Sequence, residues 1–438
     1  MSTETTSPTS RPAHITRRSL ALERQRDIYL SGISGKTPNL PLDLNKLEAL
    51  AEKKMDREAF AYIRGGAGLG STMTQNRQDF QSFRIIPRML RDVSVRDTST
   101  ELFGMALDSP LLLSPIGVLE MAHKYGDLAV AQACRETRTP MIISNQASYP
   151  MEEICEVLGT SPRWFQLYWS KSNKLVESLV KRAQNCGCSA IVVTLDTTML
   201  GWRMEDLDLG YLPFLRGKGI AQYVSDPIFQ KLMDIPPAPD AVEPPRKINF
   251  SSIKTLFQQV SNYPGGFWET LKSQRSMKAV KTFINVYSRP SLTWEDLAFL
   301  RDITELPILL KGILHPEDAQ MAIDYGMDGL LVSNHGGRQV DGSVSAIEML
   351  PELVDAVAGR IPIVMDSGIR CGADVFKALA VGAQGVCLGR PYVYGLALEG
   401  AAGVQAVIHN LLSDFELNMG LAGCRNLEEI NRDCLKTS

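Results

Sequence analysis

Long apolar runs and a strong charge bias are both absent from this sequence of 438 residues. The best candidate run, "SPLLLSPIGVLEMA" at 109–122, is interrupted by Pro115 and Glu120 and is shorter than the roughly 20 residues of a membrane-spanning helix. A formal net charge of -3 gives no sign of the basic surface that nucleic acids attract. We therefore expect a globular protein with neither a membrane nor a nucleic acid as its partner.

The eight cysteines do not form the pattern of a metal site or of a disulfide framework. Cys186 and Cys188 make one C-x-C pair, but no second pair completes a set of zinc ligands. Several other cysteines lie inside apolar patterns, which is typical of reduced, buried thiols. No metal is expected.

The first 20 residues are rich in Ser, Thr and Pro and lack the apolar centre of a secretory signal. We expect residues 1–20 to form a disordered tail and residues 21–438 to form a single domain. No targeting segment is recognised in the tail.

Short apolar runs alternate with segments of helical periodicity such as "SNKLVESLVKRAQNCG". This alternation predicts a parallel sheet, and eight copies fit a closed (β/α)₈ TIM barrel better than an open sheet. The runs are apolar at nearly every position, as in strands that are covered on both faces. The eight predicted strands are 110–115, 140–144, 164–168, 190–196, 307–312, 329–334, 362–368 and 385–390.

A doubly wound open sheet is the alternative fold. It commonly carries the dinucleotide fingerprint G-x-G-x-x-G after its first strand. The glycine-rich "GGAGLGS" at 65–71 follows a helical pattern instead and misses that spacing, so we interpret it as a turn.

A long insertion interrupts the alternation after the fourth predicted strand. About 110 residues separate Asp196 from Pro307, and they include the proline-rich "PPAPDAVEPP" at 236–245. An insertion after a barrel strand falls on the catalytic face, where it commonly forms a lid. We expect residues 204–290 to form such a lid, with a mobile part.

Polar residues and glycines follow every predicted strand, at the barrel end where active sites are built. Lys311 and His335 come directly after apolar runs, where an idle charged group is unfavourable. A hydrogen-bonded histidine in a turn would be the ordinary explanation for His335 alone, and an arginine on the surface would be that for Arg338 alone. The residues at the predicted strand ends are Gly117, Ser144, Gln166, Tyr168, Thr194, Asp196, Lys311, Ser333, His335, Arg338, Asp366, Arg370 and Arg390.

These residue types suggest removal of a proton next to a bound carboxylate. Arginines such as Arg203 and Arg338 can bind both oxygens of a carboxylate, and His335 beside Asp196 can act as a general base. Because no metal cluster is available, the electrons need an organic acceptor. Glycines and arginines after the last two strands suit a phosphate, and flavin mononucleotide has the matching shape.

The segment Ser-Asn-His-Gly-Gly-Arg-Gln at 333–339 resembles the signature of the FMN-dependent α-hydroxy-acid oxidases and dehydrogenases. The similarity runs from about residue 41 to about residue 429 and includes "FQLY", "TLDT", "ILLKGI", "DSGIR" and "GRP".

The resemblance implies a role for each matching residue. It makes His335 the base and Asp196 the residue that orients it, and it assigns the carboxylate to Arg203, Arg338 and Tyr62. Tyr168 would contact the substrate hydroxyl, and Lys311 would face the pyrimidine edge of the flavin. The cofactor-binding positions implied are Pro115, Ile116, Gly117, Ser144, Gln166, Thr194, Lys311, Ser333, Asp366, Ser367, Gly368, Arg370, Gly389 and Arg390.

Within the family, "GWRMEDLDLGYLPFLRG" and the Gly117 of "SPIGV" are most similar to the lactate 2-monooxygenases. This implies oxidation of a lactate-like L-2-hydroxy acid by O₂, coupled to oxidative decarboxylation. A simple oxidase that releases keto acid and H₂O₂, and a flavin-binding protein without catalysis, are the alternatives.

Gln146 occupies a substrate-pocket position that is often aromatic or leucine in relatives, which suggests a larger or more polar substrate. The resemblance also implies a homotetramer or a larger assembly. A cytoplasmic location is expected because the ending "CLKTS" differs from the tripeptide address of peroxisomal relatives, although the peroxisome stays open.

Overall fold

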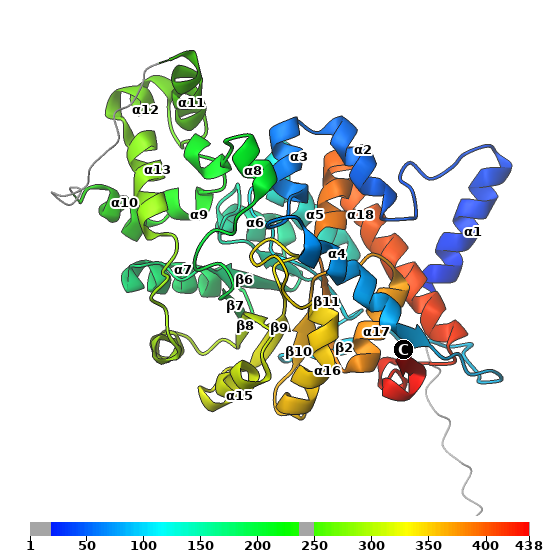
Figure 1. The fold of residues 1–438 in the computed structure, drawn as a ribbon. Helices are drawn as coiled ribbons and strands as arrows, with labels where there is room; N and C mark the ends of the chain where they lie inside the picture. Colours follow the sequence, from blue (N-terminus) through cyan, green and yellow to red (C-terminus); the bar gives the residue numbers. More distant parts are fainter. Residues whose placement is uncertain (1–18, 236–248, 438) are drawn as a thin grey trace, which may run out of the picture.

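A computed structural model describes residues 19–235 and 249–437 of the chain (Figure 1). The first helix, α1 (Leu20–Ile33), begins directly after Ser19, whose side chain accepts a hydrogen bond from the Leu22 amide. Most of the predicted tail, residues 1–18, lies outside the described residues, as does the proline-rich segment at 236–245.

Eight parallel strands close into a barrel at the positions that the sequence predicts. Their order around the barrel is β10-β11-β4-β5-β6-β7-β8-β9, and every neighbouring pair is parallel. The (β/α)₈ prediction is confirmed, and the doubly wound alternative is wrong because the sheet has no open edge. The strands are β4 (Leu111–Leu113), β5 (Met141–Ile143), β6 (Arg163–Leu167), β7 (Ile191–Thr194), β8 (Ile308–Ile313), β9 (Gly329–Val332), β10 (Ile363–Met365) and β11 (Gly385–Leu388).

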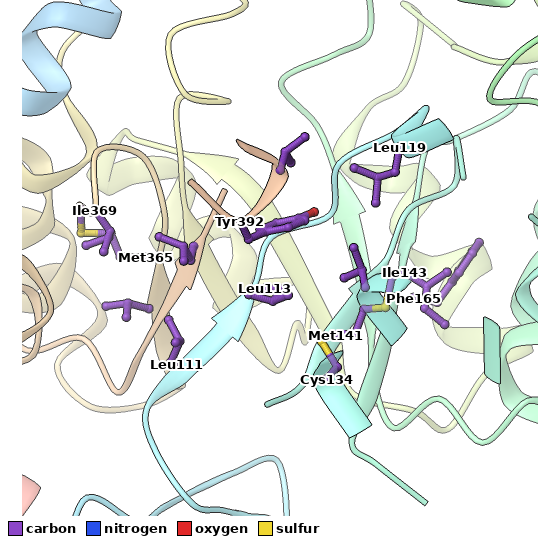
Figure 2. Close-up of a cluster of buried hydrophobic side chains, with 14 of the residues drawn as sticks. Leu111, Leu113, Leu119, Cys134, Met141, Ile143, Phe165, Met365, Ile369 and Tyr392 are labelled. Atoms are coloured by element: carbon purple, nitrogen blue, oxygen red, sulfur yellow. The ribbon is translucent and has the colours of Figure 1, made fainter. Parts of the chain in front are cut away.

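The strands are apolar throughout because each one contributes to two cores. One residue from each strand points into the barrel, and together these form a compact cluster: Leu112, Ile142, Trp164, Val192, Leu309, Leu331, Val364 and Cys387. The alternate residues pack outward against the helices. Figure 2 shows Leu111, Leu113, Ile143 and Phe165 in this outer layer.

A short hairpin lies against the inner cluster. Its strands are β2 (Thr100–Leu102) and β3 (Met105–Leu107), and their Leu102 and Leu107 side chains join the residues inside the barrel. Phe103, at the turn, packs edge-to-face on Trp164 with ring centroids 5.5 Å apart. Apolar packing therefore occupies the barrel interior and leaves its polar strand ends for a site.

Helices follow the strands and surround the barrel. They are α5 (Gly126–Thr137), α6 (Met151–Leu158), α7 (Asn173–Asn185), α14 (Leu297–Ile303), α15 (Pro316–Asp324), α16 (Ala346–Val357), α17 (Gly372–Val381) and α18 (Arg390–Leu421). Three further helices, α2 (Lys46–Lys54), α3 (Arg57–Arg64) and α4 (Ser71–Gln78), precede the barrel. Near the chain ends, β1 (Phe83–Ile85) pairs antiparallel with β12 (Leu435–Thr437). No helix in the described ranges combines the length and apolar character needed to cross a membrane.

The insertion between β7 and β8 is helical and gathers at one edge of the molecule, drawn in green in Figure 1. Its interior is aromatic: Tyr223 packs edge-to-face on Phe283, and Phe283 stacks on Tyr287 with centroids 5.0 Å apart. It meets the barrel at Gly219, where an added Cβ would lie 2.5 Å from Val118. The helices are α8 (Met204–Asp208), α9 (Ala221–Val224), α10 (Pro227–Met233), α11 (Phe250–Ser261), α12 (Phe267–Ser273) and α13 (Arg275–Val286).

Candidate active site

A cavity lies at the carboxyl ends of the barrel strands. Its empty volume is about 1040 Å³, including the part open to solvent. Most of the predicted site residues line it: Tyr62, Pro115, Ile116, Gly117, Gln146, Tyr168, Arg203, Lys311, His335, Arg338, Asp366, Ser367, Gly368, Arg370, Gly389 and Arg390.

Five predicted residues lie behind the cavity wall, where they hold the lining residues. The Ser144 hydroxyl donates to Gln166 Oε1 at 3.1 Å, and Gln166 Nε2 donates to Thr194 Oγ1 at 3.0 Å. Asp196 and Ser333 contact the lining residues His335 and Lys311. The side chains of Ser144, Gln166 and Thr194 thus form one buried hydrogen-bonded chain across three neighbouring strands.

His335 is held in an unusual backbone conformation that aims its ring at Asp196. Its φ of +58° is left-handed, and its amide donates to Ser333 Oγ at 3.0 Å. The next two residues are also left-handed, and an added Cβ at Gly337 would lie 2.6 Å from the Met73 amide nitrogen. The two glycines of the signature are therefore required by a tight turn.

The imidazole and the Asp196 carboxylate form a close pair. Nδ1 of His335 lies 2.7 Å from Asp196 Oδ1, and Thr197 Oγ1 donates to the same oxygen at 2.8 Å. Since the carboxylate accepts the Nδ1 proton, the Nε2 atom of the ring is left as a proton acceptor on the cavity side. This is the arrangement of an oriented general base.

Burial lowers the pKa of His335, Asp196 opposes this by raising it, and Lys311 lowers it further. The net pKa lies below the ordinary histidine value, so the ring is neutral and basic near pH 7. Burial alone would raise the pKa of Asp196, but the charges of His335 and Lys311 hold it well below its usual range. The carboxylate therefore stays ionised.

Lys311 is a buried, permanent positive charge between two acids. Its Nζ donates to Ser333 Oγ at 2.8 Å and lies 3.4 Å from Asp196 Oδ2 and 3.7 Å from Asp366 Oδ2. Burial would lower the pKa of this amine, but Asp196 and Asp366 raise it above its ordinary value. A cation fixed in this way can stabilise negative charge that develops on a neighbouring group.

Two guanidinium groups flank the Tyr62 ring. The Arg203 and Arg338 guanidinium carbons lie 5.9 and 5.2 Å from the ring centroid. Arg338 donates to the Gly65 carbonyl at 2.6 Å, and Arg203 donates to Gln339 Oε1 at 3.1 Å. In the described part of the chain, neither guanidinium forms an ion pair with a carboxylate. Burial and the charges of Arg203 and Arg390 lower the pKa of Arg338 to about 9, which indicates a site that favours an anion.

A second cationic group lies where the last two strands end. Arg390 donates to the Gly336 carbonyl at 2.8 Å, and Arg370 donates to the Ile369 carbonyl at 2.8 Å. Burial and the charges of Arg390 and Arg77 lower the pKa of Arg370 to about 10. α18 begins at Arg390, so its amino-terminal end also faces the cavity. Buried cations beside a helix start fit a phosphate group.

Several lining residues were not among the predicted site residues. Thr197, which donates to Asp196, stands inside the quoted "TLDT" motif, and that motif was the available signal. Phe214 and Tyr287 reach the cavity from the insertion, and no feature of their local sequence marks them. The other lining residues are Ile63, Ser114, Leu200, Gly336, Ile369 and Cys387.

Comparison with known proteins identifies this cavity. Residues 51–437 match the model of the FMN-dependent dehydrogenase family. The chain belongs to this family. The L-lactate oxidase of Lysinibacillus sphaericus is 39% identical over 402 residues, which cover 92% of this chain and 94% of the relative. Human 2-hydroxyacid oxidase 1 is 34% identical over 393 residues, which cover 90% of this chain and 96% of the relative.

Solved structures agree with the sequence comparison. A crystal structure of mandelate oxidase aligns with a TM-score of 0.72 at 34% identity, over 91% of this chain and 99% of the other. This FMN-dependent dehydrogenase is thus an enzyme of the 2-hydroxy acid oxidase type, and the cationic group of Arg370 and Arg390 fits the phosphate of its FMN.

Proposed function

We propose that this enzyme oxidises a lactate-like L-2-hydroxy acid and passes the electrons through FMN to O₂. The observation that carries the proposal is the meeting of an oriented base, His335, and a guanidinium pair, Arg203 and Arg338, in one cavity. A base beside an anion-binding pair is what removal of a proton next to a carboxylate requires.

The guanidinium pair binds and orients the substrate carboxylate. Arg203 and Arg338 line the same cavity and both lie near the Tyr62 ring, so one carboxylate can reach both forks. The backbone carbonyls that accept from Arg338 fix its direction before the substrate arrives. The Tyr62 hydroxyl assists at the carboxylate, and Tyr168 contacts the substrate hydroxyl.

His335 removes the proton from the substrate hydroxyl or the α-carbon through Nε2. Asp196 holds the ring by Nδ1 and stabilises the imidazolium that results, because it stays ionised beside Lys311. Thr197 fixes the same carboxylate oxygen. These residues keep the proton at a defined atom while the electrons leave the substrate.

FMN, when bound, supplies the two-electron acceptor. Arg370 and Arg390, with Gly368 and Gly389, would hold its phosphate, and Lys311 would face its pyrimidine edge. The cavity wall that the ring system would meet is positioned by the side chains of Ser144, Gln166 and Thr194 and by the backbone of residues 115–117.

We further propose that product retention couples the oxidation to decarboxylation. The insertion supplies Phe214 and Tyr287 to the cavity wall, and such a wall can retain the keto acid until the H₂O₂ formed from O₂ oxidises it to an acid one carbon shorter, CO₂ and water. One relative is named L-lactate oxidase, and an oxidase of this kind fits the simpler outcome, in which keto acid and H₂O₂ are released. That outcome is the second candidate.

The substrate side chain meets Gln146. This residue is 8% exposed, lines the cavity, and its side-chain amide has no hydrogen-bond partner in the residues described. Gly117 makes room for it, because an added Cβ there would lie 2.9 Å from the Gln146 Cβ. An amide in this position favours a substrate side chain with a hydrogen-bonding group.

The deciding experiment is turnover of the holoenzyme in air with a panel of L-2-hydroxy acids. Coupled decarboxylation yields an acid one carbon shorter and CO₂, whereas simple oxidation yields the keto acid and one H₂O₂ per turnover. No product with any member of the panel would contradict the proposed function. The homotetramer and the cytoplasmic location stay predictions.

A further inference from the structure

Asp206 is a buried carboxylate beside the substrate-binding arginines that no step of the proposed reaction uses. It lies in the first turn of α8, three residues after Arg203, which places both residues on the same side of that turn. Asp206 is buried, with only 7% of its surface exposed, and its Oδ1 atom has no hydrogen-bond partner in the described ranges. A buried carboxylate without hydrogen bonds is unfavourable unless nearby positive charge stabilises it.

The positive charge comes from both members of the guanidinium pair. Burial raises the pKa of Asp206 above its ordinary value, and the charges of Arg338 and Arg203, in that order, offset only part of this rise. Neither arginine forms an ion pair with Asp206 in the described structure, because Arg338 and Arg203 donate to the Gly65 carbonyl and to Gln339 instead. Asp206 therefore acts on both cations from a distance and leaves their donor faces free.

The neighbouring acid on α8 has a different task. Glu205 forms an ion pair with Arg64 of α3, and Arg64 also reaches Glu48 at 3.3 Å. This pairing ties α8 to the helix that carries Tyr62. Glu205 is engaged by Arg64 and Asp208 is exposed, so Asp206 is the buried carboxylate of α8 beside the guanidinium pair.

The net charge of the guanidinium pair and Asp206 together is balanced by one bound monoanion. Arg203 and Arg338 carry two positive charges, and ionised Asp206 supplies one negative charge that is part of the protein. We propose that Asp206 is a resident counter-anion of the Arg203–Arg338 pair that limits it to one incoming carboxylate, and so selects monoanionic over dianionic 2-hydroxy acids. The proposal rests on the proposed function for the assignment of the carboxylate to these arginines.

Removal of this charge has opposite consequences for affinity and for selectivity. In the Asp206→Asn variant the pair keeps two positive charges without compensation, so every bound anion gains Coulomb energy. A charge several ångströms away in a partly shielded site changes the affinity of a monoanion by roughly tenfold, and that of a compact dianion by roughly a hundredfold. The preference for monoanions is then reduced by about tenfold.

Equilibrium binding of two inert ligands to the FMN-loaded enzyme tests the proposal. Pyruvate is the monoanion and oxalate is the dianion, and each dissociation constant is read from the change in the visible flavin spectrum. Asp208→Asn is the matched control, because it removes an exposed charge from the same helix. We expect Asp206→Asn to tighten oxalate more than pyruvate, and Asp208→Asn to leave both dissociation constants within twofold. Equal tightening of the two ligands, or none, would overturn the proposal.

Two further variants keep the test independent of folding. If Asp206→Asn does not fold, Asp206→Ser removes the same charge with a smaller polar side chain and is expected to show the same change in the oxalate-to-pyruvate ratio. Asp206→Glu keeps the charge and is expected to keep the wild-type ratio. A ratio that follows side-chain size instead of charge would show a merely structural role and overturn the proposal.

The outcomes also separate this proposal from the proposed function. If L-2-hydroxy acids reduce the wild-type flavin but the Asp206 variants keep the wild-type ratio, only the counter-anion role is lost. If no 2-hydroxy acid reduces the flavin but the ratio changes as expected, the counter-anion role stands and the proposed reaction is lost.

Discussion

The Asp196 carboxylate contacts a different partner with each of its two oxygens: its Oδ1 atom lies 2.7 Å from His335 Nδ1, and its Oδ2 atom lies 3.4 Å from Lys311 Nζ. The lysine keeps the acid ionised, and the ionised acid orients the imidazole. One carboxylate therefore links the proposed base to the buried cation Lys311, and both respond to any change in it.

Replacement of His335 by Gln is expected to leave FMN bound but to slow flavin reduction by about 10² to 10⁴, the usual effect of losing a general base. Stopped-flow absorbance under anaerobic conditions measures the rate. His315→Gln is the control, because His315 only accepts a hydrogen bond from the Glu317 amide at the start of α15. A reduction rate within a few-fold of wild type would refute the assignment.

Arg338→Lys is expected to raise KM about tenfold or more, although the charge is unchanged, because an ammonium cannot bind a carboxylate as a fork. Arg338 also donates to Ile63 and Gly65, so a shorter group loses this support. The exposed Arg138→Lys variant serves as the control for the chemical change alone. An unchanged KM in the Arg338 variant would show that the carboxylate lies elsewhere.

The rate of flavin reduction is expected to fall in acid, because protonated His335 is not a base. Burial and Lys311 hold the pKa of His335 below its ordinary value, so the fall lies on the acid side of that value. Lys311→Met removes a charge that lowers this pKa and moves the fall to higher pH. Asp196→Asn removes a charge that raises it and moves the fall to lower pH.

A pH profile of anaerobic reduction for the three proteins checks these signs. Because both variants also slow the reaction, the position of the acid limb, and not the maximal rate, is the quantity to compare. Shifts of both variants in the same direction would mean that His335 is not the titrating group.

Gln146→Leu is expected to change which substrate is preferred. The Gln146 amide has no partner in the described residues, so it gains a hydrogen bond from a polar side chain and stays unsatisfied beside an apolar one. L-Glycerate and L-2-hydroxybutyrate form a matched pair that differs by a hydroxyl in place of a methyl group. The ratio of their kcat/KM values should move toward hydroxybutyrate by about tenfold in the variant. No change in this ratio would place the side chain elsewhere.

The barrel was predictable because each of its strands is buried on both faces. A strand such as β7, with Val192 inside and Ile191 outside, is apolar up to its last residue, Thr194, so a continuous apolar run marks it. The residues after the strands were predictable for a related reason. A lysine or histidine directly after such an apolar run, as at Lys311 and His335, is unfavourable unless it has a partner or a task.

The insertion was predictable only as an interruption. Its inner side chains, such as Phe214 and Tyr287, look like any aromatic residues in a helical pattern, and the fold alone brings them to the cavity. The burial of Asp206 was likewise not predictable, because nothing in the local sequence distinguishes it from the other acidic residues of the same short helix. Packing between segments far apart in the sequence determines which of these side chains are buried or reach the cavity, and the local sequence does not show this packing.

Anaerobic mixing of the FMN-loaded enzyme with the two enantiomers of lactate tests the central claim most directly. The account predicts that the L enantiomer removes the visible flavin absorbance within seconds, with one equivalent of lactate consumed per flavin, and that the D enantiomer leaves it unchanged. A flavin that stays oxidised with L-lactate and with every longer or more polar L-2-hydroxy acid would contradict the account.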